Sequence, residues 1–429
     1  MASWRDTIQS LTGAEPDEVR PVCWSFGYFF FLLCGYYILR PVRDEMAIEG
    51  GVQHLPWMMT GTFLTLLVAT PLFGYLSARV PRRRLLLTVY AFFGFNLLAF
   101  FLLLTTHVAP HWIARTFFVW LSVFNLFVVS VFWSFMADLF TPVQGNRLFA
   151  VIAAGGSTGA MIGPLITTAL TYVVPVPVLM LVSIAFLGAC GLCIHRLDQW
   201  ARHCADRPGE QHGQGAPIGG SMWAGIRLAL SSPYLLGICG YLFLLTATAT
   251  FLYLEQTRLV GELVPTPEGR TRLFAMVDLI VNVITFLMQF FITGQMIVRF
   301  GLASALMFLP LASAAGFGMI GLVPVLVTFI MFTIVRRVGE YALAKPAREV
   351  LFTVVSREEK YKAKNFIDTT VSRGGDATTG WIVSGVKALG VSAAQIAWLL
   401  VPMACLWAWL GWSLSKREEQ MRRQGERAA

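Results

Sequence analysis

Residues 74–84 read GYLSARVPRRR, a short segment with four arginines that lies between two strongly apolar stretches. The preceding stretch covers residues 55–77 and the following one covers residues 85–105. An α-helix needs roughly 17 to 25 apolar residues to cross a hydrocarbon core of about 30 Å, and both stretches meet that requirement. The segment is therefore typical of a cationic turn that joins two membrane-spanning helices.

The same pattern of apolar stretches continues along the whole chain. Hydrophobic residues make up 56% of the 429 positions, and only 13% are charged, well below the share of about a quarter in soluble domains. Twelve stretches have a suitable length, at residues 22–40, 55–77, 85–105, 113–137, 148–172, 176–195, 231–254, 273–294, 302–320, 322–344, 365–388 and 392–414. We therefore predict an all-α polytopic membrane protein with twelve transmembrane helices.

The distribution of basic residues predicts the orientation of these helices. If both termini are cytoplasmic, most of the 33 lysine and arginine residues lie in cytoplasmic segments, as the positive-inside rule requires. We expect an integral protein of a bacterial inner membrane with both termini in the cytoplasm. Basic loops that face anionic lipid headgroups then explain the net charge of +9, so that the bilayer is an expected partner and nucleic acid is not.

The only long polar interruption divides the chain into two six-helix halves. Its composition is that of a linker, so we predict a first bundle at 1–195, a cytoplasmic linker at 196–221, a second bundle at 222–414 and a basic cytoplasmic tail at 415–429. Short motifs recur in both bundles at a nearly constant spacing: Gly27-Tyr28 and Gly240-Tyr241, Gly74 with Arg79 and Gly294 with Arg299, Gly155-Gly156 and Gly374-Gly375. Parallel six-helix repeats are the architecture of major-facilitator transporters, whose substrate site lies between the halves.

Two motifs resemble signatures of that superfamily. Residues 74–84 are similar to its motif between spans two and three, although Ala78 stands where aspartate is usual. Gly159-x-x-x-Gly163-Pro164 resembles the fifth-span motif of its antiporters. The resemblance implies a major-facilitator-like fold.

Several membrane spans carry charged residues, which are costly in hydrocarbon unless they face water or each other. Residues 360–380 read KYKAKNFIDTTVSRGGDATTG, and this segment enters the eleventh span. In the tenth span, Glu340 lies one turn after Arg336 and can neutralise only one of the two cations Arg336 and Arg337. Asp278 begins a polar stripe on one face of the eighth span, and this stripe is either a cavity wall or a set of interhelical hydrogen bonds. The paired charges could also be structural, as a lock between the halves.

No catalytic, cofactor or metal site is predicted. Residues 155–159 read GGSTG and match the G-x-S-x-G nucleophile pattern, but they lie in an apolar helix without the strand that the pattern requires. The glycines at 155, 159 and 163 are better explained as a small-x-x-x-small helix-packing face. We therefore expect that the chain is not an enzyme.

The charged spans resemble the bacterial and plastid ATP/ADP translocases. Four stretches carry the likeness: residues 37–44 (YILRPVRD), residues 134–147 from Ser134 through Asp138 to Arg147, residues 345–349 (KPARE), and residues 359–368 (EKYKAKNFID) with Arg373. Membership in this family implies exchange of nucleotides, with basic residues that hold phosphate groups and with gates between the halves.

We therefore expect an antiporter that works by alternating access, whose two halves rock around a central basic cavity and carry a small anionic solute, with a nucleotide suspected. A monomer is expected. The candidate substrate-binding residues are Arg40, Arg43, Arg336, Arg337, Lys362, Lys364 and Arg373. The candidate gating or coupling residues are Asp44, Asp138, Asp278, Asn282, Glu340, Asp368 and Asp376.

Alternative interpretations remain at this level. A major-facilitator transporter could carry another organic anion, or a drug-like or lipid-linked solute. A membrane-embedded lipid-modifying enzyme would need a reactive side chain with a general base at the membrane surface, and a sensor or scaffold would tolerate the loss of its buried charges.

Overall fold

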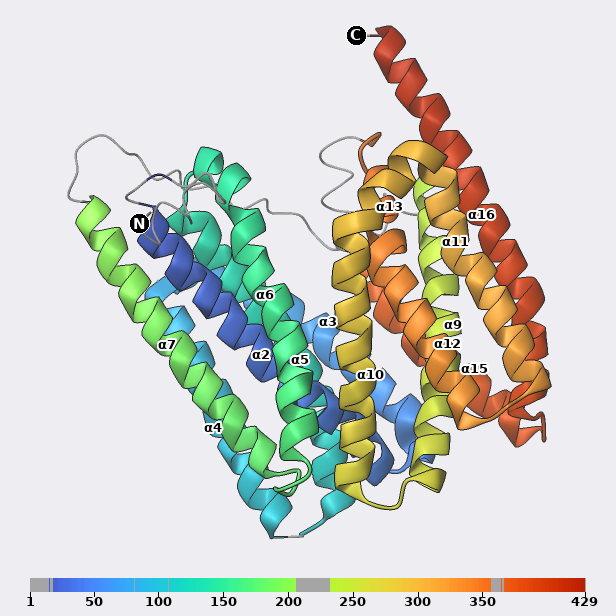
Figure 1. Ribbon diagram of the computed structural model, residues 1–429, viewed down its shortest axis with the longest axis horizontal. Helices are drawn as coiled ribbons and strands as arrows, with labels where there is room; N and C mark the ends of the chain where they lie inside the picture. The colour runs from blue at the N-terminus through green and yellow to red at the C-terminus, as the bar shows by residue number, and fades with distance from the viewer. Residues whose placement is uncertain are drawn as a thin grey trace. The chain divides into compact units, whose positions relative to one another are not determined.

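The protein is helical throughout the part that the computed structural model describes, namely residues 15, 18–80, 82–106, 108–205, 232–355, 364 and 366–428. Figure 1 shows long helices and no strand among these residues. The first helices are α2 (Val19–Glu49), α3 (Leu55–Arg79), α4 (Arg82–Thr105), α5 (Pro110–Leu139), α6 (Pro142–Leu170) and α7 (Val178–Ala205), with the short η1 (Val52–His54) before α3.

The helices after the linker are interrupted more often. They are α9 (Pro233–Leu263), α10 (Pro267–Met288), α11 (Gly294–Leu322), α12 (Leu326–Gly339), α13 (Lys345–Leu351), α15 (Ser372–Ala388) and α16 (Ala393–Ala428). Three π-helical turns continue them: η2 (Gln289–Thr293), η3 (Glu340–Ala344) and η4 (Ile367–Val371). Gly301, at φ 78° and ψ 171°, breaks α11. We call each continuous helical segment a rod, and the rod that begins with α10 ends at Gly301.

The described residues therefore form twelve rods, and the predicted twelve-helix fold is confirmed. Ten of them are long and apolar enough to cross a membrane. The other two are the α12–η3–α13 rod and the η4–α15 rod, which carry most of the charges that the sequence placed inside spans. One difference from prediction is in α2, which continues through Pro41 to Glu49 instead of ending near residue 40.

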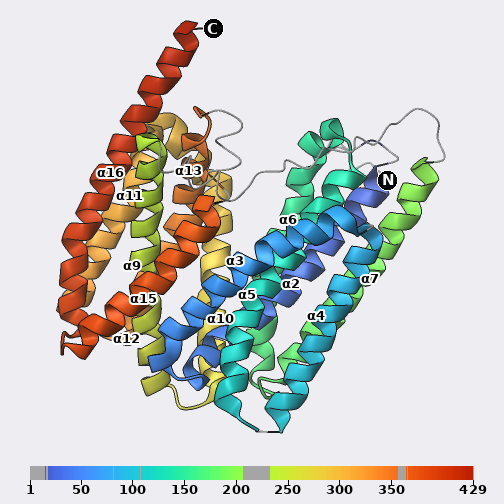
Figure 2. The same ribbon diagram turned by 180° about the vertical axis from the view of Figure 1, so that it is seen from behind.

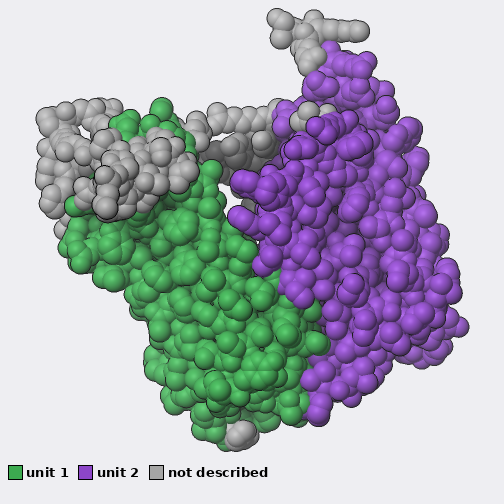
Figure 3. Space-filling model, viewed as in Figure 1, with its two compact units in different colours: residues 1–50, 68–217, 266–279 green, residues 51–67, 218–265, 280–429 purple. Residues whose placement is uncertain are grey.

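The chain folds into two compact units, coloured in Figure 3. Unit 1 consists of residues 1–50, 68–217 and 266–279, and unit 2 consists of residues 51–67, 218–265 and 280–429. The first part of α10 thus belongs to the unit built mainly from the first six helices. The first part of α3 belongs to the other unit. The predicted linker begins inside α7, and its residues from 206 onward lie outside the described part of the chain.

Close packing of α2 against α6 forms the centre of unit 1, where α4 also lies along α7 (Figure 2). A Cβ added at Gly155 or Gly159 would lie 2.4 Å from the carbonyl oxygen of Phe26 or Phe30, and one at Gly163 would lie 2.7 Å from that of Cys34. The predicted small-residue packing face is therefore confirmed. It allows the two backbones to approach closely, which is how helices associate where lipid removes the hydrophobic driving force.

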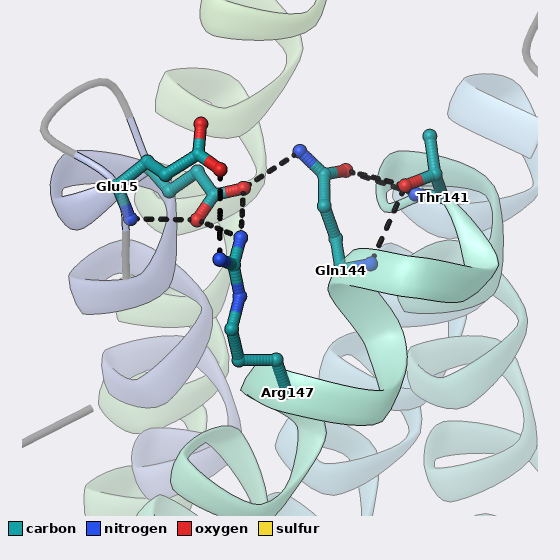
Figure 4. Close-up of polar contacts among 5 residues, drawn as sticks. Glu15, Thr141, Gln144 and Arg147 are labelled. Carbon is teal, nitrogen blue, oxygen red and sulfur yellow. Dashed lines mark hydrogen bonds and ion pairs between the residues drawn. The ribbon is translucent and has the colours of Figure 1, made fainter. Parts of the chain in front are cut away.

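A polar cluster fixes the beginnings of the same two helices (Figure 4). Thr141 and Gln144 form a capping box at the start of α6. The side-chain amide of Gln144 donates a hydrogen bond of 2.9 Å to Glu18, and the Arg147 guanidinium contacts both oxygens of the same carboxylate at 2.8 and 2.7 Å. The buried Glu18 thereby joins the start of α2 to α6.

Unit 2 has a separate core between α9, α11 and α16. The hydroxyl of the fully buried Tyr241 donates a 2.9 Å hydrogen bond to the carbonyl of Leu306, and its ring packs on Trp407. Tyr28, at the corresponding place in the first repeat, is equally buried in unit 1 and shares a hydrogen bond of 2.5 Å with Tyr90. Each unit therefore contains a buried tyrosine from the recurring Gly-Tyr motif.

The α2–α6 contact predicts a large difference between two conservative substitutions. Gly159→Ala should lower the unfolding free energy by about 1–3 kcal/mol, because its methyl group would overlap the α2 backbone. Gly188→Ala on α7 is the matched control, since a Cβ there meets no atom within 4 Å. Thermal unfolding of both purified variants checks this prediction. Equal stability of the two variants would contradict the close approach of α2 and α6.

Candidate functional site

Four charged residues of unit 1 connect α2 with the first part of α10. The guanidinium of Arg40 lies 3.6 Å from the carboxylate of Asp278, whose side chain is only 1% exposed. One turn further along α2, Glu45 is also 1% exposed and receives a 2.9 Å hydrogen bond from Arg270. We call these four residues the unit 1 charged cluster. It has two acids and two bases, and each acid is ion-paired with a base.

The adjacent cations of unit 1 use other partners. The guanidinium of Arg43 lies 4.1 Å from the ring centroid of Phe118 on α5, in a cation–π contact. Arg272 donates a 2.9 Å hydrogen bond to the carbonyl of Thr171 on α6 and lies over the ring of Tyr172. These contacts add to the ion pairs that hold the start of α10 on α2 and α6.

Unit 2 contains a second set of charges, centred on α12. Arg336, with only 3% of its side chain exposed, donates a 2.6 Å hydrogen bond to the carbonyl of Leu245 on α9. Its other contact is the ion pair of 3.3 Å with Glu340 that the sequence predicted. The Leu245 carbonyl also accepts a 3.0 Å hydrogen bond from the hydroxyl of Thr248 on α9. Arg336 therefore ties α12 to the backbone of α9.

The neighbouring helix α15 supplies a second ion pair. Arg373 lies 3.4 Å from Asp376, and Thr250 of α9 donates a 2.9 Å hydrogen bond to the same carboxylate. Arg336 also interacts electrostatically with Asp376. We call Arg336, Arg337, Glu340, Arg373 and Asp376 the unit 2 charged cluster. It contains three cations and two anions, and the side chain of Arg373 is 41% exposed.

Further ion pairs extend from this cluster toward the end of α13. Arg348 lies 3.0 Å from Asp368 of η4, and Lys364 lies 2.5 Å from Glu349. At the other end of α15, Lys387 pairs with the fully buried Glu255 of α9. The described charges of these helices are therefore largely arranged as pairs.

The π-helical turns explain how these side chains come to face one another. A π turn inserts one residue into a helix, which shifts the direction of the side chains that follow, and such turns often occur at functional sites. Glu340 begins η3 and Asp368 lies in η4, which ends directly before Ser372 and Arg373. All three π turns of the described residues lie in unit 2.

The remaining candidate residues are placed as follows. Asp44 on α2 and Asp138 in the last turn of α5 are half-buried, as are Asn282 on α10 and Arg337 on α12. The polar stripe of α10 is turned toward protein, since Asp278 and Thr285 are buried while Val283, Ile284 and Phe286 are exposed. Lys362 lies in residues 356–363, outside the described residues.

Sequence reasoning missed Glu45, Arg270 and Glu255. Glu45 lies beyond the predicted first span, which ends at residue 40, whereas α2 continues to Glu49. The start of α10 did carry a signal, since Thr266 precedes Pro267, and these are an N-cap residue and a proline at the first helical position. No local pattern predicts the pair between Glu255 and Lys387, which is set by the packing of α9 on α15.

Comparison with known proteins identifies the family. The profile of the Major Facilitator Superfamily matches residues 25–336, most of the chain. The chain belongs to the Major Facilitator Superfamily. This membership makes it a secondary transporter by class. No curated protein matches it.

Solved structures of other transporters share the fold. The nucleoside transporter NupG is 12% identical, covering 92% of this chain and 98% of its own with a TM-score of 0.63. A bacterial homologue of the human lysosomal transporter Spinster is 12% identical, with coverages of 95% and 99% and a TM-score of 0.59. A POT family transporter in complex with 5-aminolevulinic acid is 13% identical, with coverages of 93% and 96% and a TM-score of 0.61. At these identities the likeness concerns the fold alone.

The buried pair of the unit 1 charged cluster predicts a strong asymmetry between single and double substitutions. Arg270→Ala should lower stability by about 3–5 kcal/mol, because it leaves the Glu45 carboxylate buried without its cation. The double variant Arg270→Met with Glu45→Leu should recover most of this loss. Arg423→Gln removes one side of an exposed α16 pair and serves as the control, with an expected effect of at most about 1 kcal/mol.

Thermal unfolding of the purified variants measures these differences. If Arg270→Ala unfolds at the temperature of the control, the ion pair does not hold α10 on α2.

Proposed function

We propose that this superfamily member carries a small anionic solute with a phosphate group, by alternating access and in exchange for a second anion. The observation that carries the proposal is the unit 2 charged cluster, where three arginines and two acids lie on α12, η3 and α15, which the sequence predicts as membrane spans. Such groups persist in a membrane where they have a function that offsets their cost. The resemblance to ATP/ADP translocases favours a nucleotide among the possible solutes.

Arg373 is the cation best suited to bind the solute. Its side chain is more exposed than those of Arg336, Glu340 and Asp376, and its contact with Asp376 is long at 3.4 Å. A guanidinium has five N–H donors in a fixed fork, which matches two oxygens of one phosphate. We propose that a phosphate group of the solute binds Arg373, while Thr250 keeps the Asp376 carboxylate in position.

Arg336 has a supporting role in this proposal. It is almost fully buried, and its donors are directed to Leu245 and Glu340. The positive charge of Arg336 offsets the negative charge of Asp376 and adds to the electrostatic field at Arg373. Charges interact strongly with one another where water is scarce. The role of solute ligand stays a prediction for the other basic candidates, namely Arg40, Arg43, Arg337, Lys362 and Lys364.

Four ion-paired acids are proposed gating or coupling groups, namely Asp278, Glu340, Asp368 and Asp376. The same role stays a prediction for Asp44, Asp138 and Asn282. Each pair can open when its cation turns to the solute or when a helix moves. Ion pairs that exchange partners in this way would connect binding with conformational change.

The proposal predicts that Arg373→Gln abolishes uptake while leaving the protein folded. Glutamine removes the charge, but Asp376 keeps its hydrogen bond from Thr250 and its interaction with Arg336, so we expect little change in unfolding temperature. Lys416→Gln on the exposed part of α16 is the matched control for loss of one cation. Uptake of labelled nucleotides or sugar phosphates into proteoliposomes checks this prediction.

Arg336→Ala should instead lower both uptake and stability, because the half-buried Glu340 loses its cation and the Leu245 carbonyl loses the donor that ties α12 to α9. An Arg373→Gln variant that transports at the wild-type rate would exclude Arg373 as a solute ligand. A variant that loses stability as much as Arg336→Ala would assign Arg373 a structural role.

Exchange is tested separately by preloading. Proteoliposomes filled with the unlabelled solute should take up labelled solute several times faster than empty ones, because an exchanger returns to the outside state mainly with solute bound. Equal initial rates in filled and empty proteoliposomes would remove exchange from the proposal and leave uniport or ion-coupled transport.

A further inference from the structure

An apolar groove of about 750 Å³ lies in unit 2 at the junction of the α10 rod with α11. Its walls come from η2 on one side and from the residues that follow Gly301 on the other. Phe291, Phe300, Phe308 and Leu311 line it and remain exposed. The groove is separate from the charged clusters described above, and no part of the proposed solute site lines it.

Backbone geometry creates the groove. Gly301 adopts a positive φ of 78°, which costs a glycine little and other residues much more, and it turns the chain between two membrane spans. The hydroxyl of Ser304 donates a 2.7 Å hydrogen bond to the carbonyl of Gly301 and stabilises the turn. A Cβ at Gly294 or Gly301 would meet no atom within 4 Å, so the two helices are open to an occupant at this end.

The depth of the groove matches one leaflet of a bilayer. The turn at Gly301 separates two candidate membrane spans and therefore lies at a membrane surface. Phe291 lies ten residues before Gly301 and Leu311 lies ten residues after it, which at 1.5 Å per residue places both about 15 Å along their helices. This distance is about half of a hydrocarbon core of roughly 30 Å.

A cation lies at the shallow end of the groove. Arg299 is exposed and stands two residues from the turn, at the depth of the lipid headgroups. Gln295 and Ser304 add amide and hydroxyl groups to the lining, and no acidic residue belongs to it. The groove thus combines an apolar part of leaflet depth with one positive charge at the membrane surface.

We propose that this groove binds one anionic phospholipid, with its phosphate at Arg299 and an acyl chain along Phe300, Phe291 and Leu311. A second copy of this chain or a purely apolar solute would gain nothing from a guanidinium at the headgroup level. The charge distribution of the sequence predicts that this end faces the cytoplasm, where anionic lipids attract basic residues.

The groove is linked by hydrogen bonds to the unit 2 charged cluster. From the η2 side, Gln289 donates a 3.0 Å bond to the carbonyl of Tyr341, and Thr293 donates a 2.8 Å bond to that of Ala342. Both acceptors belong to η3, which begins with Glu340, the partner of Arg336. A lipid that packs on Phe291 and Ile292 therefore contacts the same π-helical turn whose Gln289 and Thr293 hold η3. The proposed lipid binding does not depend on the proposed function. Only an effect of the lipid on transport depends on that function.

Native mass spectrometry of the purified, delipidated full-length protein tests the proposal, with phosphatidylglycerol and phosphatidylcholine titrated in parallel. The wild type should bind one phosphatidylglycerol in preference to phosphatidylcholine. Arg299→Gln should weaken phosphatidylglycerol binding about fivefold, equivalent to about 1 kcal/mol, and remove the preference. Ala303→Trp should fill the groove and weaken binding of both lipids.

Arg79→Gln is the matched control, because it removes an exposed cation at the end of a membrane helix in unit 1. If Arg79→Gln weakens binding as much as Arg299→Gln, the preference arises from surface charge in general and the proposal is wrong. Wild-type lipid binding by Ala303→Trp, or a dimer of the chain in place of the lipid adduct, would also overturn it. Loss of lipid binding with unchanged uptake would remove only the effect on transport.

Discussion

An ionised side chain inside a membrane needs a partner of opposite charge or water, and this constraint determines how the charged helices pack. Within the described residues, Arg40 meets Asp278, Glu45 meets Arg270, Arg336 meets Glu340 and Arg373 meets Asp376. Two of these four pairs, Arg40 with Asp278 and Glu45 with Arg270, join α2 to α10 and so also fix a helix position. Helices α12 and α15 are more polar than ordinary membrane helices. Because their charges are paired, these helices are nevertheless stable in unit 2.

Close backbone packing is the second requirement, and it is separate from the ion pairs. In unit 1, Gly155, Gly159 and Gly163 bring α6 against the backbone of α2. The first part of α10 is then added to these helices by charged contacts. The first part of α3 joins unit 2 by different chemistry, since Trp57 packs edge-to-face on Trp381, whose indole N–H donates a 3.0 Å hydrogen bond to Thr60. Charged contacts thus hold the first part of α10 in unit 1, and aromatic packing with one hydrogen bond holds the first part of α3 in unit 2.

Much of the fold could be predicted from the sequence, because helix length and apolar periodicity are local properties. The spans, the glycine face of α6 and the i, i+4 pair of Arg336 with Glu340 follow from spacing along one helix. The pairing of Glu45 with Arg270 and that of Glu255 with Lys387 do not, since these partners lie more than a hundred residues apart in sequence. Nor does the continuation of α2 through Pro41, because tertiary contacts in a membrane protein can compensate for the missing backbone donor. The π turns that direct Glu340 and Asp368 had no recognisable sequence signal.

The central claim is that the unit 2 charged cluster binds an anion at Arg373. The most direct measurement is a thermal-shift screen of the purified wild type and of Arg373→Gln against nucleotides, sugar phosphates and carboxylates. A ligand at a hundred times its dissociation constant stabilises the folded protein by about 2.7 kcal/mol. The account predicts that at least one phosphate-bearing solute raises the unfolding temperature of the wild type and leaves that of Arg373→Gln unchanged. Equal stabilisation of both proteins, or stabilisation of the wild type by none of these anions, would contradict it.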